Sequence, residues 1–361
     1  MTKGSSITAE TDPSGIVNEE VHLLRSAADA PGVAVALLYD NQRLFYNIGD
    51  AVREPQIPVT ENTFFGMGSV DKVFTATMLA CNVVLGNMQL SDPVVKYLPQ
   101  EVSKRGSEDI KKVTLQQLAT HTSGMPSQGP DKPAYFLFNE LPPSESILNW
   151  WINFRAEPGV GNCYRYSNVG FVTLGYAVGG PHFHNNQLLF EQVTSPLNMS
   201  QTASYITPPG GEVAQGYVGT PTRSLKPWNT GPGLKTTTHD LMNFLSACVF
   251  SDQSTPLGQA LELTKTRIPF LGKQCDGGNP PGIGLAWNIN PMQISEKTYV
   301  IVAKDGMTSM GGFSAWIGFI PEVMGIALLS NKAVTDWGSA APRSPGKTGR
   351  SILMRLLSNT V

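Results

Sequence analysis

Residues 58–72 read PVTENTFFGMGSVDK, and this stretch ends in the tetrapeptide Ser69-Val-Asp-Lys72. The apolar residues that follow, up to Leu85, leave little polar face, which is typical of a buried central helix that ends at Gly86. Positions i and i+3 of a helix share one face, so the Ser69 hydroxyl and the Lys72 ammonium lie together. A serine hydroxyl becomes a good nucleophile only when a neighbour takes its proton. The stretch predicts such a pair at the start of a buried helix.

Strand patterns lie on both sides of this helix along the chain, and helical patterns fill the middle. Alternating apolar residues over 32–49, with Asp40-Asn41 between the two halves, predict an antiparallel hairpin. The other expected helices are 17–28, 114–118, 144–154, 168–178, 240–250 and 350–357, and the late strands are 299–302, 313–319 and 324–329. Strands from both ends with helices between them indicate an α/β fold. We expect a mixed layer with a central antiparallel sheet flanked by helices, interrupted by an inserted, mostly helical domain.

The length of 361 residues corresponds to roughly two domains at ~150 residues each. We expect an α/β domain formed by both termini, residues 1–85 and 235–361, and a helical domain of residues 86–234. The active site is expected in the cleft between them.

Charge and composition exclude several function classes. Charged residues make up 15% of the chain with a net charge of −2, so no basic surface for nucleic acid is expected. No apolar run is long enough to span a membrane, and the first residues show no secretory signal pattern. We therefore expect a cytoplasmic protein with no nucleic-acid and no membrane partner.

Nothing in the cysteine and histidine pattern indicates a metal site. The four cysteines (Cys81, Cys163, Cys248, Cys275) are scattered, without the close pairs that bind zinc. His182-Phe-His184 has no acidic or cysteine partner nearby in sequence and is interpreted as a surface loop. We expect neither a metal nor a cofactor.

Two later segments could complete a catalytic site. Tyr166-Ser-Asn168 offers a phenol and an amide on one side of an extended segment, and Lys304-Asp-Gly306 precedes a glycine-rich strand at Gly311. Nearby cations lower the pKa of a tyrosine, so Lys72 and Lys304 together could prepare Tyr166 to accept a proton.

Chance matches leave alternatives open. Ser344-Pro-Gly-Lys347 has the same Ser-x-x-Lys spacing as Ser69 and Lys72, and Lys347-Thr-Gly349 is a second lysine triplet. We place the latter in a loop that leads into a helix. The sequence therefore does not decide whether Lys304 or Lys347 is the second cation of the site.

Several motifs together strongly resemble the serine β-lactamase and penicillin-binding-protein superfamily, in particular the class C β-lactamases and their esterase and transacylase relatives. The resemblance covers residues 30–335. The motifs that carry it are PVTENTFFGMGSVDK (58–72), LSDPVVKYLP (90–99), LATHTSG (118–124), Tyr166-Ser-Asn168, and Gly311-Gly-Phe with Phe319-Ile-Pro.

The resemblance implies a β-lactamase/transpeptidase-like fold and assigns a role to each candidate. Ser69 is the acylated nucleophile, Lys72 and Tyr166 transfer its proton, and Asn168 positions the substrate. The triplet Lys304, Asp305 and Gly306 borders the substrate, and the backbone amides of Ser69 and Met307 form the oxyanion hole. His121, inside LATHTSG, is expected to pack and not to transfer protons.

One departure from the family pattern concerns the substrate. Asp305 stands where relatives have threonine, and two additional residues precede Gly311, which we expect to displace the neighbouring edge strand. An acid at this position repels an anionic substrate such as a penicillin. We expect a Ser-x-x-Lys hydrolase of small-molecule metabolism that cleaves an ester, thioester or amide through an acyl-enzyme on Ser69. The alternatives are an acyltransferase that uses a small-molecule acceptor, and a non-acylating receptor or lyase on the same fold. The partner is a small acyl substrate, and the oligomeric state is left open.

Overall fold

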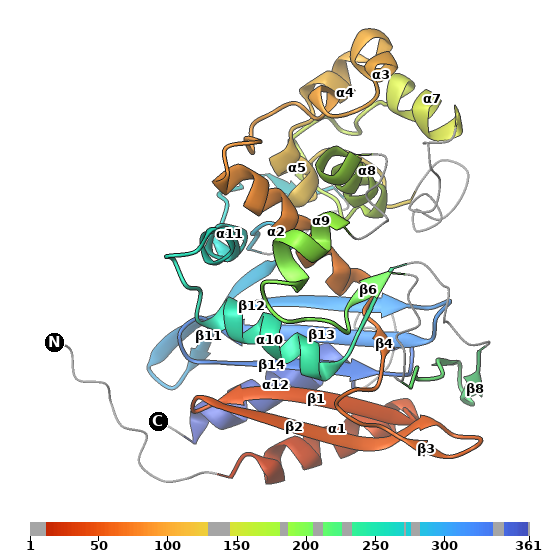
Figure 1. Cartoon of the computed structure of the whole chain (residues 1–361), viewed down its shortest axis with the longest axis vertical. Coiled ribbons are helices and arrows are strands. Elements are labelled where there is room, and N and C mark those ends of the chain that lie inside the picture. Colours follow the sequence, from red (N-terminus) through yellow and green to blue (C-terminus); the bar gives the residue numbers. More distant parts are fainter. Residues whose placement is uncertain are drawn as a thin grey trace, which may run out of the picture.

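A seven-stranded antiparallel sheet forms the centre of the computed structural model (Figure 1). The structure describes residues 12–128, 145–180, 187–204, 212–225, 233–270, 272–275, 282–334 and 343–359. The strand order is β11-β12-β13-β14-β1-β2-β3. In chain order these strands are β1 (Gly32–Tyr39), β2 (Gln42–Val52), β3 (Ile57–Pro58), β11 (Asn288–Ile294), β12 (Lys297–Thr308), β13 (Phe313–Ile320) and β14 (Met324–Ser330).

Strand β1 joins the two ends of the chain within this sheet. It pairs with β2 on one side, through a turn at Asp40 and Asn41 whose positive φ angles of 48° and 58° suit a tight hairpin. On its other side it pairs with β14, so that Val33 lies opposite Ser330. Every residue of β1 is buried, because both faces of the sheet are covered.

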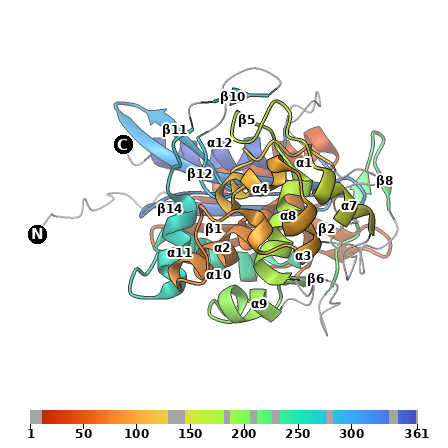
Figure 2. The ribbon, with the colours of Figure 1, turned by 90° about the horizontal axis from the view of Figure 1, so that it is seen from above.

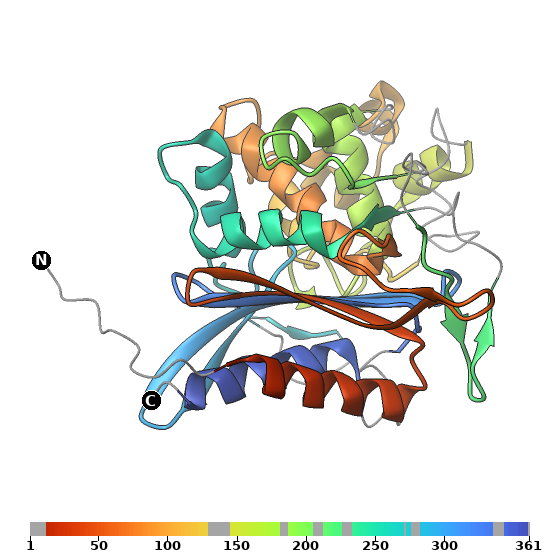
Figure 3. The same cartoon turned by 60° about the horizontal axis from the view of Figure 1, so that its bottom comes forward.

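One face of the sheet carries the first and last helices, α1 (Ser14–Ala28) and α12 (Pro345–Ser358), which lie side by side (Figure 3). Their apolar residues pack against alternate positions of β1 that begin with Val33. Buried Glu20 of α1 accepts hydrogen bonds from Arg343 at 2.6 Å and from Arg355 at 3.0 Å. These contacts hold the two helices together.

The opposite face carries α2 (Asp71–Val84), and α10 (Thr238–Val249) lies between this helix and the sheet. Phe74 and Phe244 stack with ring centroids 4.4 Å apart, and α11 (Pro256–Lys265) packs on α2. Positions 72–82 of α2 are all buried, as the lack of a polar face predicts.

The helices farthest from the sheet come from the middle of the chain (Figure 1). They are α3 (Gln100–Arg105), α4 (Glu108–Lys112), α5 (Leu115–Ala119), α7 (Glu145–Asn153) and α8 (Asn168–Gly179), and the short α9 (Gln187–Leu189) lies closer to the sheet. Short strands lie outside the seven-stranded sheet: β4 (Phe65–Gly66), β5 (Cys163–Tyr164), β6 (Ala203–Ser204), β7 (Tyr217–Val218), β8 (Arg223–Ser224), β9 (Leu234–Thr236) and β10 (Lys273–Gln274). The expected mixed α/β fold is confirmed, and the expected division at residues 85 and 235 stays a prediction.

Two elements differ from the expectation. The last helix begins at Pro345 and not at Arg350, because Ser344 caps it by accepting a hydrogen bond from the Lys347 amide and proline suits a first helical turn. Placing Lys347-Thr-Gly349 in a loop was therefore wrong. Strand β12 extends to Thr308, well beyond the predicted residues 299–302.

Candidate active site

Ser69 lies where the chain turns from β4 into α2. A single 3₁₀ turn over Gly68–Val70 precedes the helix, which places the Ser69 side chain at the helix N-terminus. The Tyr166 hydroxyl donates a hydrogen bond to Ser69 Oγ at 2.6 Å, and Lys72 Nζ donates another at 3.2 Å. The structure thus brings together the predicted nucleophile and both predicted proton-transfer groups.

Tyr166 and Asn168 reach the site from the segment between β5 and α8. Ser167 caps α8, since its hydroxyl accepts a hydrogen bond from the Gly170 amide at 2.8 Å. The backbone amide of Asn168, the first residue of α8, donates to the Ser127 carbonyl oxygen at 2.9 Å. Both predicted residues, Tyr166 and Asn168, line the same cleft as Ser69.

Lys304 of β12 also lies beside the Tyr166 ring. Its Nζ is 5.3 Å from the centroid of the Tyr166 ring, and the Nζ of Lys72 is 5.5 Å from the same centroid. Burial and the Lys72 charge lower the pKa of Lys304 to about 7, although Asp305 and Asp71 oppose this shift. Burial raises the pKa of the Asp71 carboxyl, partly offset by the two lysines. The site therefore holds two lysine side chains beside the phenol, and Lys304 loses its proton more easily than an ordinary lysine.

The other candidate cation, Lys347, is exposed in the first turn of α12. Its neighbours Ser344, Pro345 and Gly346 line the cleft, but Lys347 itself does not. The geometry therefore places Lys304 beside Tyr166 and assigns Lys347 to the surface.

The backbone of β12 passes directly against the turn that carries Ser69. A Cβ atom on Gly68, which has a φ of +53°, would lie 2.5 Å from the Met307 nitrogen. A Cβ on Gly306 would lie 2.0 Å from the Met67 carbonyl oxygen. Only glycine permits this approach at both positions. The approach brings the Met307 backbone next to that of Ser69, as the predicted oxyanion hole requires.

These groups open onto a cleft of about 310 Å³. Its lining combines hydroxyl, amide, charged and apolar side chains from both ends of the chain and from the middle: Ser69, Ser127, Tyr164, Tyr166, Asn168, Asn288, Lys304, Asp305, Gly306, Met307, Ala315, Val334, Ser344, Pro345 and Gly346. The Met307 side chain is partly exposed at this wall.

Asp305 has an ionic partner that the sequence did not indicate. Its Oδ2 lies 3.8 Å from an Arg350 guanidinium nitrogen in α12.

The pairing of β12 with β13 runs without interruption from Val302 opposite Phe319 to Thr308 opposite Phe313. The residues between Thr308 and Phe313 therefore form the turn of a regularly paired hairpin. The expected displacement of the neighbouring edge strand relative to other members of the family stays a prediction.

Several cleft residues were missed by the sequence reasoning. Tyr164 had a usable signal, because it lies two residues before Tyr166 in an extended segment, where alternate side chains share a side. Asn288 and Val334 had none, since their approach depends on how distant segments of the chain pair and pack. The same holds for Arg350, which is not part of the cleft lining but pairs with Asp305.

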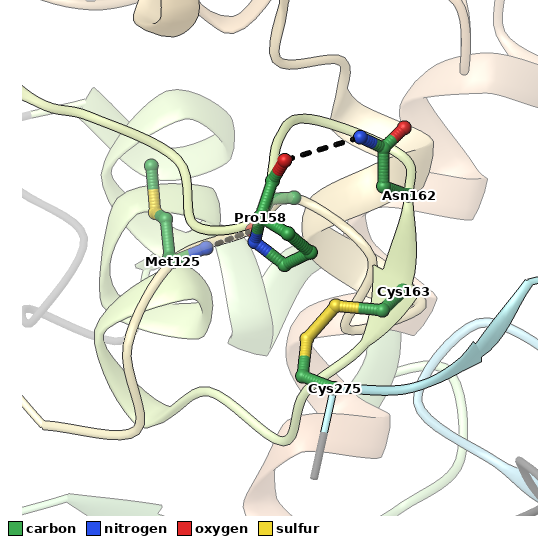
Figure 4. Close-up of a disulfide and its surroundings, with 6 residues drawn as sticks. Met125, Pro158, Asn162, Cys163 and Cys275 are labelled. Atoms are coloured by element: carbon green, nitrogen blue, oxygen red, sulfur yellow. Dashed lines mark hydrogen bonds between the residues drawn. A yellow bond between two sulfur atoms is a disulfide. The ribbon is translucent and has the colours of Figure 1, made fainter. Parts of the chain in front are cut away.

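A disulfide (Figure 4) involves Cys163, which precedes Tyr166 by three residues along the chain. It joins Cys163 of β5 to Cys275, which directly follows β10, with a Cα to Cα distance of 5.2 Å. The two short strands run parallel and side by side (Figure 2), and the Cys275 amide donates to the Tyr164 carbonyl oxygen at 3.0 Å. The other two cysteines, Cys81 and Cys248, are free and buried. The sequence reasoning did not foresee this pairing.

Among the described residues, no group of three or more histidine, cysteine, aspartate or glutamate side chains is placed to hold a metal ion. His182 and His184 lie outside the described residues. In the same described part of the chain, no helix is long and apolar enough to cross a bilayer.

Comparisons with known proteins agree with the fold and the motifs. Residues 20–343 match the model of the Beta-lactamase family. Proteins named "Beta-lactamase" from Pseudomonas fluorescens and Escherichia coli (strain K12) are 27% and 28% identical, with alignments that cover 89% and 91% of this chain and 94% and 91% of those proteins. A third, from Yersinia enterocolitica, is 30% identical over 88% of this chain and 86% of its own length. A solved structure described as a class C beta lactamase superposes with a TM-score of 0.77 at 24% identity, covering 96% of this chain and 99% of that one. The chain therefore belongs to the serine β-lactamase family as a serine hydrolase, and it has the fold of a class C β-lactamase.

Proposed function

We propose that this enzyme cleaves an ester, thioester or amide of a small molecule through an acyl-enzyme on Ser69. One observation carries the proposal: Ser69 Oγ accepts hydrogen bonds from both Tyr166 and Lys72 at the cleft. For the reaction, one member of the Tyr166 and Lys72 pair is unprotonated, as phenolate or free amine, because a phenol and an ammonium cannot accept the Ser69 proton. Ser69 Oγ then attacks the carbonyl carbon, and its proton passes to this coupled base. The pair then gives the proton to the departing oxygen, sulfur or nitrogen.

Water completes the cycle. It adds to the acyl carbon, loses a proton to the same pair, and releases the acid, while Ser69 regains its proton. The backbone amides of Ser69 and Met307 are proposed to hold the oxyanion, which is supported by the close approach of Gly68 to Met307. Asn168 is proposed to orient the substrate, since it lines the cleft beside Tyr166.

We propose that neutral acyl esters are better substrates than penicillins. Asp305 lines the cleft next to the proposed oxyanion site, and Arg350, which could otherwise attract an anion, is paired with it. The carboxylate of Asp305 therefore partly balances Arg350, so that Arg350 attracts a substrate carboxylate less strongly. Apolar side chains of Met307, Ala315 and Val334 offer contacts to an acyl or alcohol group instead.

Intact-mass measurement after exposure to a fluorophosphonate tests the acyl-enzyme mechanism. One covalent adduct on wild type and none on a folded Ser69→Ala variant are expected. Ser69→Ala should keep the wild-type unfolding temperature, because this hydroxyl carries little packing. A folded wild-type protein without an adduct would favour the non-acylating receptor or lyase.

Hydrolysis and acyl transfer share the acyl-enzyme, so they are separated by their second substrate. The wild-type protein is given an activated acyl ester together with a small alcohol or amine. If the rate of free-acid release does not fall as the acceptor concentration increases, the result supports the hydrolase. Conversion of most of the acyl group to the new ester or amide supports the transferase.

The cytoplasmic location stays a prediction that nothing in the structure supports. Disulfides persist mainly in oxidising compartments, so the pairing of Cys163 with Cys275 favours such a compartment instead. Cell fractionation of the expressed protein distinguishes the two locations.

A further inference from the structure

His121 lies buried behind the catalytic tyrosine, at the end of the turn that follows α5. Only 4% of its surface is exposed, and its backbone has a positive φ of 59°. Its ring lies 4.4 Å from the Tyr166 ring, centroid to centroid, with a tilt of 37°. It also contacts Phe171 at 4.9 Å. His121 lines none of the cleft, so it does not contact the substrate there.

Two hydrogen bonds connect His121 to the residues on either side of Tyr166. The Arg165 amide donates to the His121 carbonyl oxygen at 2.8 Å, and the Ser167 amide donates to His121 Nδ1 at 3.1 Å. One residue thus holds the backbone immediately before and after the tyrosine while its ring lies against the phenol ring.

The acceptor role of Nδ1 requires a neutral imidazole. Because Nδ1 accepts a hydrogen bond from the Ser167 backbone amide, the single ring proton is on Nε2. Nε2 has no hydrogen-bond partner among the described residues. Protonation of Nδ1 would break the bond to Ser167 and would add a cation beside Lys72 and Lys304. Burial and these two lysines accordingly lower the pKa of His121 well below its usual value. His121 therefore cannot serve as a general acid at neutral pH.

We propose that His121 is a positioning residue that fixes the Tyr166 hydroxyl on Ser69 through its hydrogen bond to Ser167 and its ring contact with Tyr166. This rests on the proposed acyl-enzyme function and adds to it, because it makes proton transfer depend on a residue outside the cleft. A packing role alone predicts a different outcome: loss of stability without any dependence on the Tyr166 hydroxyl.

A double-mutant cycle with Tyr166→Phe tests the proposal, using hydrolysis of p-nitrophenyl acetate and the thermal unfolding temperature of each variant. His121→Ala removes the acceptor and the ring, and it should lower kcat by ~10-fold or more in the wild-type background, with little change in KM. In the Tyr166→Phe background, which lacks the hydroxyl to be positioned, the same change should lower kcat by less than ~2-fold.

His121→Asn provides the rescue. Its side-chain oxygen can replace Nδ1 as acceptor, and asparagine tolerates a positive φ. This variant should retain several-fold more kcat than His121→Ala. If His121→Ala does not fold, His121→Leu, which fills the space but has no acceptor, takes its place in the cycle. Ile110→Ala is the matched control, because Ile110 is fully buried in α4. It should lower the unfolding temperature and leave kcat unchanged.

Three results would overturn the positioning role. One is an equal loss of kcat from His121→Ala in the wild-type and Tyr166→Phe backgrounds. The others are a loss smaller than ~3-fold in the wild-type background and the absence of rescue by His121→Asn. Failure of the proposed function is a separate outcome. In that case Ser69→Ala and Tyr166→Phe would themselves retain turnover, whatever His121 does.

Discussion

Asp305 and Arg350 form an ion pair across the cleft wall, with a nitrogen to oxygen distance of 3.8 Å. The carboxylate comes from the strand that carries Lys304 and the guanidinium from the second turn of α12. Arg350 therefore partly balances the charge of Asp305.

This pair predicts which substitutions improve reaction with anionic β-lactams. Asp305→Thr removes the carboxylate and releases Arg350, so kcat/KM for benzylpenicillin should rise relative to a neutral ester, by about 1–2 kcal/mol in transition-state free energy. In an Arg350→Ala background the gain should be smaller, because no cation is released. Steady-state kinetics of the four proteins measure both effects. Efficient hydrolysis of benzylpenicillin by the wild-type enzyme would refute the argument.

The two candidate cations predict different variant activities. Lys304→Ala removes the ammonium 5.3 Å from the Tyr166 ring and should lower kcat/KM for an activated ester by ~10²-fold. Lys347→Ala changes an exposed residue of α12 and should leave kcat/KM within about 2-fold. Parallel kinetics on the two variants decide the assignment, and a larger loss in Lys347→Ala would reverse it.

Burial of Lys304 predicts a pH dependence of stability. Its pKa is about 7 in the folded protein and 10.5 in the unfolded chain, so between these values the unfolded state binds more protons. Stability therefore rises with pH across this window, by up to about 1.4 kcal/mol per pH unit from this residue. Below pH 7 the full cost of burying the charge is present.

Urea unfolding of wild type and Lys304→Met at several pH values between 7 and 10 measures this contribution. The stability advantage of Lys304→Met over wild type should be largest near pH 7 and should shrink as the pH rises. A difference that is constant across the range would show that Lys304 keeps its ordinary pKa in the folded protein.

The disulfide predicts a redox-dependent stability. Cys163 and Cys275 are separated by 112 residues, and closing a loop of this length typically stabilises a protein by about 2–4 kcal/mol. Wild type should lose this stability in dithiothreitol, and a Cys163→Ser, Cys275→Ser double variant should show the loss without any further effect of the reductant. Identical urea midpoints for oxidised and reduced wild type would contradict the prediction.

How far the sequence predicts this protein depends on the range of the interaction. Helix α2 and the hairpin of β1 and β2 follow from local periodicity, and Ser69 and Lys72 meet because they are one helical turn apart. Strand β12 is predicted too short because Lys304, Asp305 and Gly306 interrupt its apolar pattern, although Lys304 is buried. The pairs Cys163 with Cys275 and Asp305 with Arg350 join distant segments and leave no local pattern.

The pairing of β1 with β14 has a consequence for how the protein is made. Strand β1 is synthesised before the helical region, whereas β14, which covers its second edge, is synthesised after it. Until then the hairpin of β1 and β2 exposes an unpaired, strongly apolar edge, which is the kind of surface that other chains can join. The central sheet can therefore be completed only after β14 has been synthesised.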